Sequence, residues 1–240
     1  MEMIEAIVLR SLDYKDNSKI LYLYTNKGLV SVIAHGVKKM NSPFRVLSQT
    51  GNYIQIAYSK GDFPSLKEGS LIDEYSNLRN DLFSYTYFTH ILELVNNTIP
   101  EDSNHPKMFQ FIKKIATKLN EGIDAETISL IFELKLLYFL GYGLNLKQCN
   151  ICNLQEDLVF SVEHGGLVCR NHLSLQQNSY DQDMTQVISI LYGIDLDQQT
   201  VPVLDKNRKV IIRHIVDLLF NDYLGYKTKS RSIIEQFQKY

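Results

Sequence analysis

The chain has 240 residues, of which 45% are apolar and 11% aromatic, so it can bury one or two hydrophobic cores. Its first residues carry charges every few positions, and no apolar run is long enough to cross a bilayer, which argues against a secretory signal and against a membrane protein. We therefore expect a soluble, cytoplasmic protein. The three cysteines cannot pair completely, and a reducing compartment would keep them as thiols, so they indicate a metal site or a redox motif.

The formal net charge of -2 is divided unevenly along the chain. Residues 1–80 hold ten Lys/Arg against eight Asp/Glu (+2), residues 81–204 seven against fifteen (-8), and residues 205–240 eight against four (+4). Between residues 10 and 60, eight basic residues face two aspartates, a local excess of six positive charges. Such asymmetry favours contact with nucleic acid, although a solvated, lysine-rich surface would give the same count.

The first eighty residues predict a run of β-strands. Segments rich in Val, Ile, Leu and Tyr are separated by turn-forming sequences such as "DYKDN", "NKG" and "KGDFPSLKEG". The predicted strands are "EAIVLRS", "KILYLYT", "GLVSVIAHG", "NYIQIAYS" and "GSLIDEY". Consecutive strands with no helix between them favour a small, closed or nearly closed β-barrel, and at this size the commonest is the OB-fold, which binds oligonucleotides.

After Asn77 the apolar residues recur at three- and four-residue spacing, which predicts helices. The spacing holds from Tyr85 to Val95 and from Phe109 to Leu119, and "ETISLIFELKLLYFLGYG" is apolar over most of its surface. Further helical stretches are expected at about 184–193 and 206–224. The fold class is therefore α+β, with an OB-fold domain over residues 1–80 and a helical domain over residues 81–240.

All the cysteines lie in the segment "CNICNLQEDLVFSVEHGGLVCRNH". Cys149 and Cys152 are two residues apart, and Cys169 and His172 repeat that gap, which is the ligand spacing of a tetrahedral zinc site. Between the pairs, "LVFSV" and "LVC" flank a Gly165-Gly166 turn, so a hairpin should bring the two pairs together. We expect a zinc-ribbon-like insertion at about 147–175, and with four protein ligands its single zinc would be structural.

Two other kinds of cysteine site fit the sequence less well. A redox pair would sit in a βαβ context that is absent here and would leave Cys169 and His172 without a role. A zinc deaminase needs a His-x-Glu upstream of the cysteine pair, and none precedes Cys149. Three buried cysteines without a metal stay open as an alternative. His164 could replace His172 as the fourth ligand, although it lies at the predicted hairpin tip.

Four stretches, in order along the chain, carry a resemblance to a known family. They are "EAIVLRSLDYKDNSKILYLYTNKGLVSVIAHGVKK", "IFELKLLYFLGYGLNLKQCNIC", "GGLVC" and "YLGYKTKSRSIIEQF". Together they span nearly the whole sequence, which resembles the bacterial RecO family of recombination mediators in DNA repair. Many members with a zinc site use four cysteines, whereas this chain offers His172 in the last position.

The resemblance implies a protein that binds single- and double-stranded DNA and anneals complementary strands. It also implies that the protein acts with RecR to help RecA load onto strands covered by single-stranded DNA-binding protein (SSB). The implied partners are thus DNA, RecR, the SSB C-terminal tail and, indirectly, RecA, at the nucleoid in the cytoplasm. No bond is made or broken in that task, and the sequence has no phosphate-binding glycine loop or Ser/His/Asp arrangement, so we expect no enzymatic activity.

Basic and aromatic side chains of the first strands are the candidates for DNA contact, since cations neutralise phosphates and aromatic rings stack on bases. Leu21 and Leu23 alternate with Tyr22 and Tyr24, and a leucine core would turn the tyrosines outward, although tyrosines that fill the far side of the barrel stay open as the alternative. Tyr53 is a further candidate for stacking. The basic residues expected to contact DNA are Arg10, Lys15, Lys38, Lys39 and Arg45 and, at the carboxyl end, Lys227, Lys229 and Arg231.

The three carboxyl-terminal basic residues recur every second position, so an extended segment would align them in a basic strip, and a solvated tail is the alternative. The acidic, apolar SSB tail would need an apolar groove with a nearby cation, for which Lys135 is a candidate. The alternative function is a non-catalytic zinc-ribbon adaptor that acts through protein contacts. Such an adaptor would need the ribbon but not the basic bias of residues 10–60.

Overall fold

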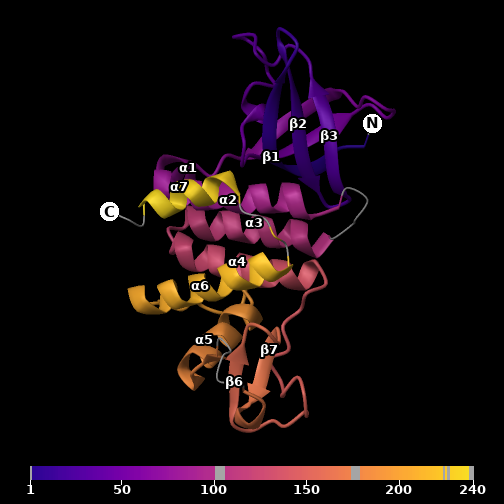
Figure 1. Cartoon of the computed structure of the whole chain (residues 1–240). Coiled ribbons are helices and arrows are strands. Elements are labelled where there is room, and N and C mark those ends of the chain that lie inside the picture. The colour runs from indigo at the N-terminus through magenta and orange to yellow at the C-terminus, as the bar shows by residue number, and fades with distance from the viewer. Residues whose placement is uncertain (1, 101–105, 174–178, 224, 226–227, 238–240) are drawn as a thin grey trace. The chain divides into compact units, whose positions relative to one another are not determined.

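The structure is a computed structural model that describes residues 2–100, 106–173, 179–223, 225 and 228–237 (Figure 1). The chain forms two compact units, one of Met1–Ala125 with Thr228–Tyr240 and one of Glu126–Lys227. The predicted α+β class is confirmed, with a β-sheet first and helices after it. The boundary predicted at residue 80 lies where strands give way to helices. The first unit extends beyond that point and includes helices as well. Among the residues described, no helix has both the length and the apolar character needed to cross a bilayer.

The first unit begins with a five-stranded antiparallel sheet of order β3-β2-β1-β4-β5. Its strands are β1 (Ile4–Tyr14), β2 (Ser18–Thr25), β3 (Gly28–Ala34), β4 (Tyr53–Tyr58) and β5 (Leu66–Asp73), with a short 3-10 helix η1 (Val46–Ser48) before β4. A parallel bridge between Ile33 and Ser65 joins the two edge strands, and the Ile33 N–H donates to the Pro64 carbonyl at 2.8 Å. The sheet therefore closes on itself as the OB-like barrel predicted from the strand run.

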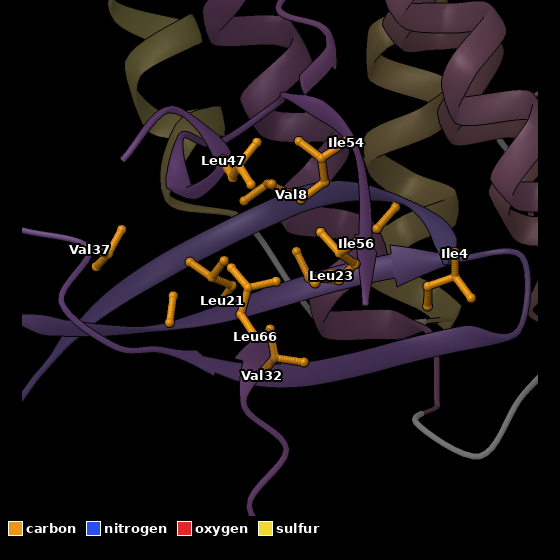
Figure 2. Close-up of a cluster of buried hydrophobic side chains, with 12 residues drawn as sticks. Ile4, Val8, Leu21, Leu23, Val32, Val37, Leu47, Ile54, Ile56 and Leu66 are labelled. Atoms are coloured by element: carbon orange, nitrogen blue, oxygen red, sulfur yellow. The ribbon is translucent and has the colours of Figure 1, made fainter. Parts of the chain in front are cut away.

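The barrel interior is filled by aliphatic side chains, which point toward one another in Figure 2. Leu21 and Leu23 are fully buried in this cluster, as predicted for the core face of β2. The two tyrosines of β2 alternate with these leucines and are not part of the core cluster, but Tyr24 is 0% exposed, while Tyr22 is half-buried. Tyr53 is also buried, and its hydroxyl contacts Glu5 and Lys113. Neither Tyr24 nor Tyr53 offers a ring to solvent for stacking.

Helices α1 (Ser76–Asn80), α2 (Leu82–Thr98), α3 (Pro106–Asn120) and α7 (Lys229–Phe237) complete the described part of the first unit. Asp81 caps α2 by accepting hydrogen bonds from the Phe83 and Ser84 N–H groups. Helix α2 packs against β1, and the outer face of the barrel is therefore partly buried. Helix α7, yellow in Figure 1, lies along α2. Sequence periodicity did not predict α7.

The second unit contains α4 (Ala125–Phe139, beginning at the boundary), α5 (Gln182–Gly193) and α6 (Lys206–Tyr223), and a small sheet of β6 (Leu158–Ser161), β7 (Gly166–Cys169) and β8 (Ser179–Tyr180). A buried ion pair joins α4 to α6. Both terminal guanidinium nitrogens of Arg213 donate to the Glu133 carboxylate at 2.7 Å. Glu133 also accepts from the Ser129 hydroxyl at 2.8 Å. These bonds satisfy charges that would otherwise be costly to bury.

Candidate metal centre and nucleic-acid interface

The predicted hairpin of the second unit is present as β6 and β7. Its turn ends at Gly165, whose φ of +57° is a conformation that glycine adopts without strain, and the Gly165 N–H donates to the Val162 carbonyl at 2.9 Å. In the register of the hairpin, Cys169 pairs with Leu158 at the open end, away from the turn. The hairpin thus carries Cys169 and the following short 3-10 helix η2 (Arg170–His172) back to where the strand pair begins.

The segment before the hairpin is bound to β7 by its backbone. Asn150 is the centre of this attachment: its N–H donates to the Leu167 carbonyl at 2.8 Å, and its side-chain amide donates to the His164 carbonyl at 2.6 Å. The backbone of Asn145 forms hydrogen bonds with the two residues on either side of Gly166: its N–H donates to the Gly165 carbonyl, and its carbonyl accepts from the Leu167 N–H. Cys149 and Cys152 belong to this attached segment, so their thiols are brought to the end of β7.

The four predicted ligands meet there. The ligand atoms of Cys149, Cys152, Cys169 and His172 all lie within 4.8 Å of one another. The Cys152 and Cys169 sulfurs are 3.8 Å apart, and His172 Nδ1 lies 3.7 Å from the Cys149 sulfur and 3.2 Å from that of Cys169. A tetrahedron with metal–sulfur distances of about 2.3 Å has edges of about 3.8 Å. Both the donor set and its dimensions fit a zinc site.

The site also favours ionised sulfur. Burial opposes the loss of the Cys149 proton, but the backbone N–H groups of Cys152, Cys169 and Ile151 surround the sulfur, and the pKa of Cys149 falls from 9.0 to about 5. Burial raises the pKa of Cys169, and its neighbouring thiols raise it further. Without a metal, negative charge would therefore concentrate on Cys149. A dication at the centre of the four ligands would allow the other thiols to ionise as well.

His164 is not part of this cluster. Its Nδ1 lies 3.0 Å from the Ser161 hydroxyl, at the tip of the hairpin, as expected from its place in the sequence. The third strand, β8, was not predicted; it pairs with β6 through Phe160 and Ser161. Behind the hairpin, the Thr185 hydroxyl of α5 accepts a hydrogen bond from the Phe160 N–H at 3.0 Å. The ligand cluster thus stands on a small sheet backed by a helix.

The attachment of Asn145 to β7 leads to a prediction about Gly166. A Cβ at this position would lie 2.3 Å from the Asn145 carbonyl oxygen, a backbone atom that cannot move aside alone. Gly166→Ala should therefore push the segment that carries Cys149 away from β7 and destabilise the second unit by about 1–3 kcal/mol. Thermal unfolding would measure this loss. Gly193→Ala is the matched control, because a Cβ there meets no atom within 4 Å; equal effects of the two changes would contradict the prediction.

In the first unit, three barrel loops converge at His35. Its Nδ1 lies 3.5 Å from the hydroxyl of Ser18, the first residue after the β1–β2 turn, and its Nε2 lies 3.4 Å from the hydroxyl of Ser65, the last residue before β5. His35 itself begins the long loop that follows β3. The Lys38 N–H donates to the Asn17 carbonyl at 3.2 Å, which joins the same loops a second time.

The predicted DNA-contacting residues of the first strands are distributed over these loops and the adjoining strands. Lys15 lies in the β1–β2 turn, and Lys39 and Arg45 lie in the loop after β3; all three are exposed. Lys38 is half-buried and forms an ion pair with Asp13 at 2.7 Å, which lowers the pKa of that carboxyl group. Sequence reasoning did not select Lys60, which is exposed in the loop before β5. The local charge excess of residues 10–60 was the signal that could have found it.

The remaining basic residue of this group, Arg10, lies on the outer face of β1. Its guanidinium carbon stands 4.0 Å from the centroid of the Tyr22 ring, so the two planar groups form a cation–π pair. Arg10 is exposed and Tyr22 half-buried. Of the tyrosines considered for stacking, Tyr22 is thus the one that the structure leaves accessible.

The carboxyl-terminal basic strip requires a correction. The chain is helical from Lys229 onward, so Lys229 and Arg231 do not project to one side of an extended segment. Arg231 is 5% exposed and its Nε lies 3.6 Å from Glu235, whereas Lys229 is exposed. Lys227 lies outside the described residues. In this conformation Arg231 is buried and does not belong to an exposed basic strip.

Comparison with known proteins agrees with the resemblance seen in the sequence. The model "Recombination protein O N terminal" matches residues 1–75, and "Recombination protein O C terminal" matches residues 79–232. The chain belongs to the recombination protein O family. The DNA repair protein RecO of Bacillus cytotoxicus is 30% identical over 248 aligned residues, covering 100% of this chain and 98% of the relative, and that of Bacillus mycoides is 29% identical with the same coverage. Membership of this family assigns the chain a role in DNA repair and recombination.

Proposed function

We propose that this protein is a recombination mediator that binds single- and double-stranded DNA through the loop end of its barrel. The observation that carries the proposal is the convergence at His35 of three loops that bear Lys15, Lys39, Arg45 and Lys60. Ammonium and guanidinium groups on such loops neutralise phosphates and release counterions, and they do so without reading sequence. The exposed side chains of Met40 and Phe63 on the same loops add apolar surface that suits unstacked bases.

The mediator would bring two polyanions together on one basic surface and so anneal complementary strands. Acting with RecR, it would help RecA load onto DNA covered by SSB, whose acidic C-terminal tail would dock on the helical domain. Lys135 is less suited to that tail than expected, because its ammonium group already donates to the Tyr192 carbonyl at 2.8 Å. None of these steps makes or breaks a covalent bond, and the protein would act without catalysis, at the nucleoid in the cytoplasm.

The proposed role of the metal is structural. The three thiols and His172 would hold one Zn²⁺ with no position left for water, so the ion would supply folding energy and not a reactive site. The ion would hold the segment of Cys149 and Cys152 against the hairpin. A zinc-ribbon adaptor without DNA binding is the competing function, and the basic loops of the barrel argue against it.

A binding experiment tests the proposed interface. Changing Lys38, Lys39 and Arg45 together to alanine should weaken binding to single strands of unrelated sequence by similar factors, because cations bound to phosphates carry no sequence information. The plot of log affinity against log salt should become shallower by up to about 0.7 for each phosphate that the variant no longer neutralises. Fluorescence anisotropy of labelled oligonucleotides at several salt concentrations measures both quantities, and strand annealing should fall in parallel.

The matched control removes three positive charges elsewhere: Lys107, Lys118 and Lys206. Lys113 is unsuitable for this purpose, because it donates to Tyr53 and to Glu5 at the base of the barrel. Equal losses in the two triple variants would mean that net charge, and not the loop end, governs binding. Failure of the unchanged protein to bind DNA at any of these salt concentrations would favour the adaptor function.

A further inference from the structure

The outer face of the barrel contains a small cavity that none of the loop residues lines. It has a volume of about 180 Å³ and lies over β1, β2 and β3, with one wall from the end of α2. Its lining includes Arg10, Tyr22, Leu29, Val30, Ser31 and Asn96. Pockets for drug-sized ligands measure roughly 300–1,000 Å³, so this one suits a single planar ring system.

The strand register builds the floor of the cavity. Arg10 pairs with Tyr22, and Tyr22 pairs with Ser31, so the three residues form one row across the neighbouring strands β1, β2 and β3. A bulge between Val8 and Arg10 shifts the register and turns Arg10 to the outer face. The guanidinium then lies 4.0 Å from the Tyr22 ring centroid. A guanidinium stacked on a ring presents its second planar face to a third planar group.

The rim of the cavity combines hydrogen-bonding and apolar groups. Ser31 is exposed and carries a hydroxyl, which both donates and accepts. Asn96 of α2 carries an amide with a donor and an acceptor, and one of its N–H groups donates to the Asn97 side chain at 2.8 Å. Leu29 and Val30 supply apolar wall. A planar heterocycle with a mixed polar edge matches this lining, and because the rim offers both donors and acceptors, it suits more than one base.

We propose that this cavity binds one unpaired nucleobase of a DNA strand, stacked on the guanidinium of Arg10. The inference rests on the proposed function, since the same strand would place its phosphates on the barrel loops. Along β2, four residues separate Tyr22 from Ser18 at the loop end, a span of about 13 Å at the usual rise of a strand. A strand that follows the loops therefore reaches the cavity. A base inside a duplex is paired and stacked, so the cavity distinguishes single strands from duplex and releases its base when a complementary strand pairs with it.

Two substitutions test the cavity without removing charge. Ser31→Leu fills it from the strand side, and Arg10→Lys keeps the positive charge but removes the planar group. Each should weaken binding of an oligothymidine by roughly 5- to 100-fold, the loss expected for one base stack, with no change in salt slope. Binding to an oligonucleotide of the same length that has abasic sites throughout should be unchanged. Ser70→Leu, at an exposed serine on β5, is the matched control and should behave like the unchanged protein.

Three outcomes distinguish the base-binding cavity from the proposed function. If Ser31→Leu and Arg10→Lys bind oligothymidine as tightly as Ser70→Leu does, the cavity holds no base, and loop binding stands as long as the Lys38/Lys39/Arg45 variant loses affinity. If both variants lose as much affinity for the abasic strand as for oligothymidine, then Arg10 and Ser31 contact the sugar-phosphate backbone of the DNA. That result would overturn the inference. If the unchanged protein binds neither strand, the proposed function fails together with the inference.

Discussion

Replacing Cys149 or Cys169 with serine should release the metal and unfold the hairpin region of the second unit. Both sulfurs are buried at the centre of the ligand cluster, and a serine hydroxyl is a poor ligand for zinc. Structural zinc contributes on the order of 10 kcal/mol of binding free energy in zinc-finger peptides near neutral pH, comparable with the total stability of about 5–15 kcal/mol of a typical domain. The unchanged protein should contain about one zinc per chain by elemental analysis, and both variants should contain far less and melt at a lower temperature.

His164→Ala is the control for this experiment, because that histidine contacts Ser161 and lies outside the ligand cluster. It should keep the metal and nearly all of the stability. Zinc should also dissociate as the pH falls, since thiolate ligands bind only in the deprotonated form and protons compete for them. A protein purified without chelators that contains no zinc, or a Cys149→Ser variant as stable as His164→Ala, would contradict the structural role of the metal.

The barrel and the ligand cluster were predictable because their signals are local. Strand alternation separated Leu21 and Leu23 from their neighbours, and the paired two-residue gaps with a hairpin between them placed the ligands together. The burial of Tyr24 was not predictable from strand alternation. Alternation identifies two faces of a strand, but it does not reveal that α2 packs against the outer side of the sheet. A barrel strand with a covered outer face then buries residues of both parities.

The C-terminal helix was missed for a related reason. Its first turn is held by partners from α2: Thr228 contacts His90 Nδ1 at 2.5 Å, and the Ser230 N–H donates to Glu93 at 3.0 Å. These partners are 138 and 137 positions away along the chain, so no short window of sequence contains them. The alternation of Lys227, Lys229 and Arg231 suggested an extended strip, whereas tertiary contacts favour a helix that buries Arg231.

No pattern in the sequence indicated the buried ion pair of the second unit. Removing its guanidinium is the second substitution for which we expect a large loss of stability. Glu133 and Arg213 are 80 positions apart, with 2% and 9% of their side chains exposed. Burial lowers the pKa of Arg213, but Glu133 and then Asp217 more than offset this and raise it. Arg213→Met removes the guanidinium and leaves a carboxylate in the core, which should cost about 3–5 kcal/mol in chemical denaturation at neutral pH.

The loss should depend on pH with a definite sign. Without the guanidinium, desolvation raises the pKa of Glu133 in the folded state above its unfolded value, so the folded state of the variant holds an extra proton. Its deficit relative to the unchanged protein should therefore shrink as the pH falls toward the unfolded pKa of a glutamate and grow as the pH rises through the folded one. Adding Glu133→Leu should restore most of the stability at neutral pH, since it removes the buried charge.

Arg208→Met on the same helix is the matched control. Arg208 binds Asp183 through two nitrogens, but its side chain is 41% exposed and that of Asp183 58%, so solvent weakens the pair and its loss should cost no more than about 1 kcal/mol. The two variants thus separate burial from the mere presence of an Arg–carboxylate pair. An Arg213→Met protein no less stable than Arg208→Met, or one whose deficit does not change with pH, would mean that water or local rearrangement accommodates the Glu133 charge and that the ion pair does not hold α4 to α6.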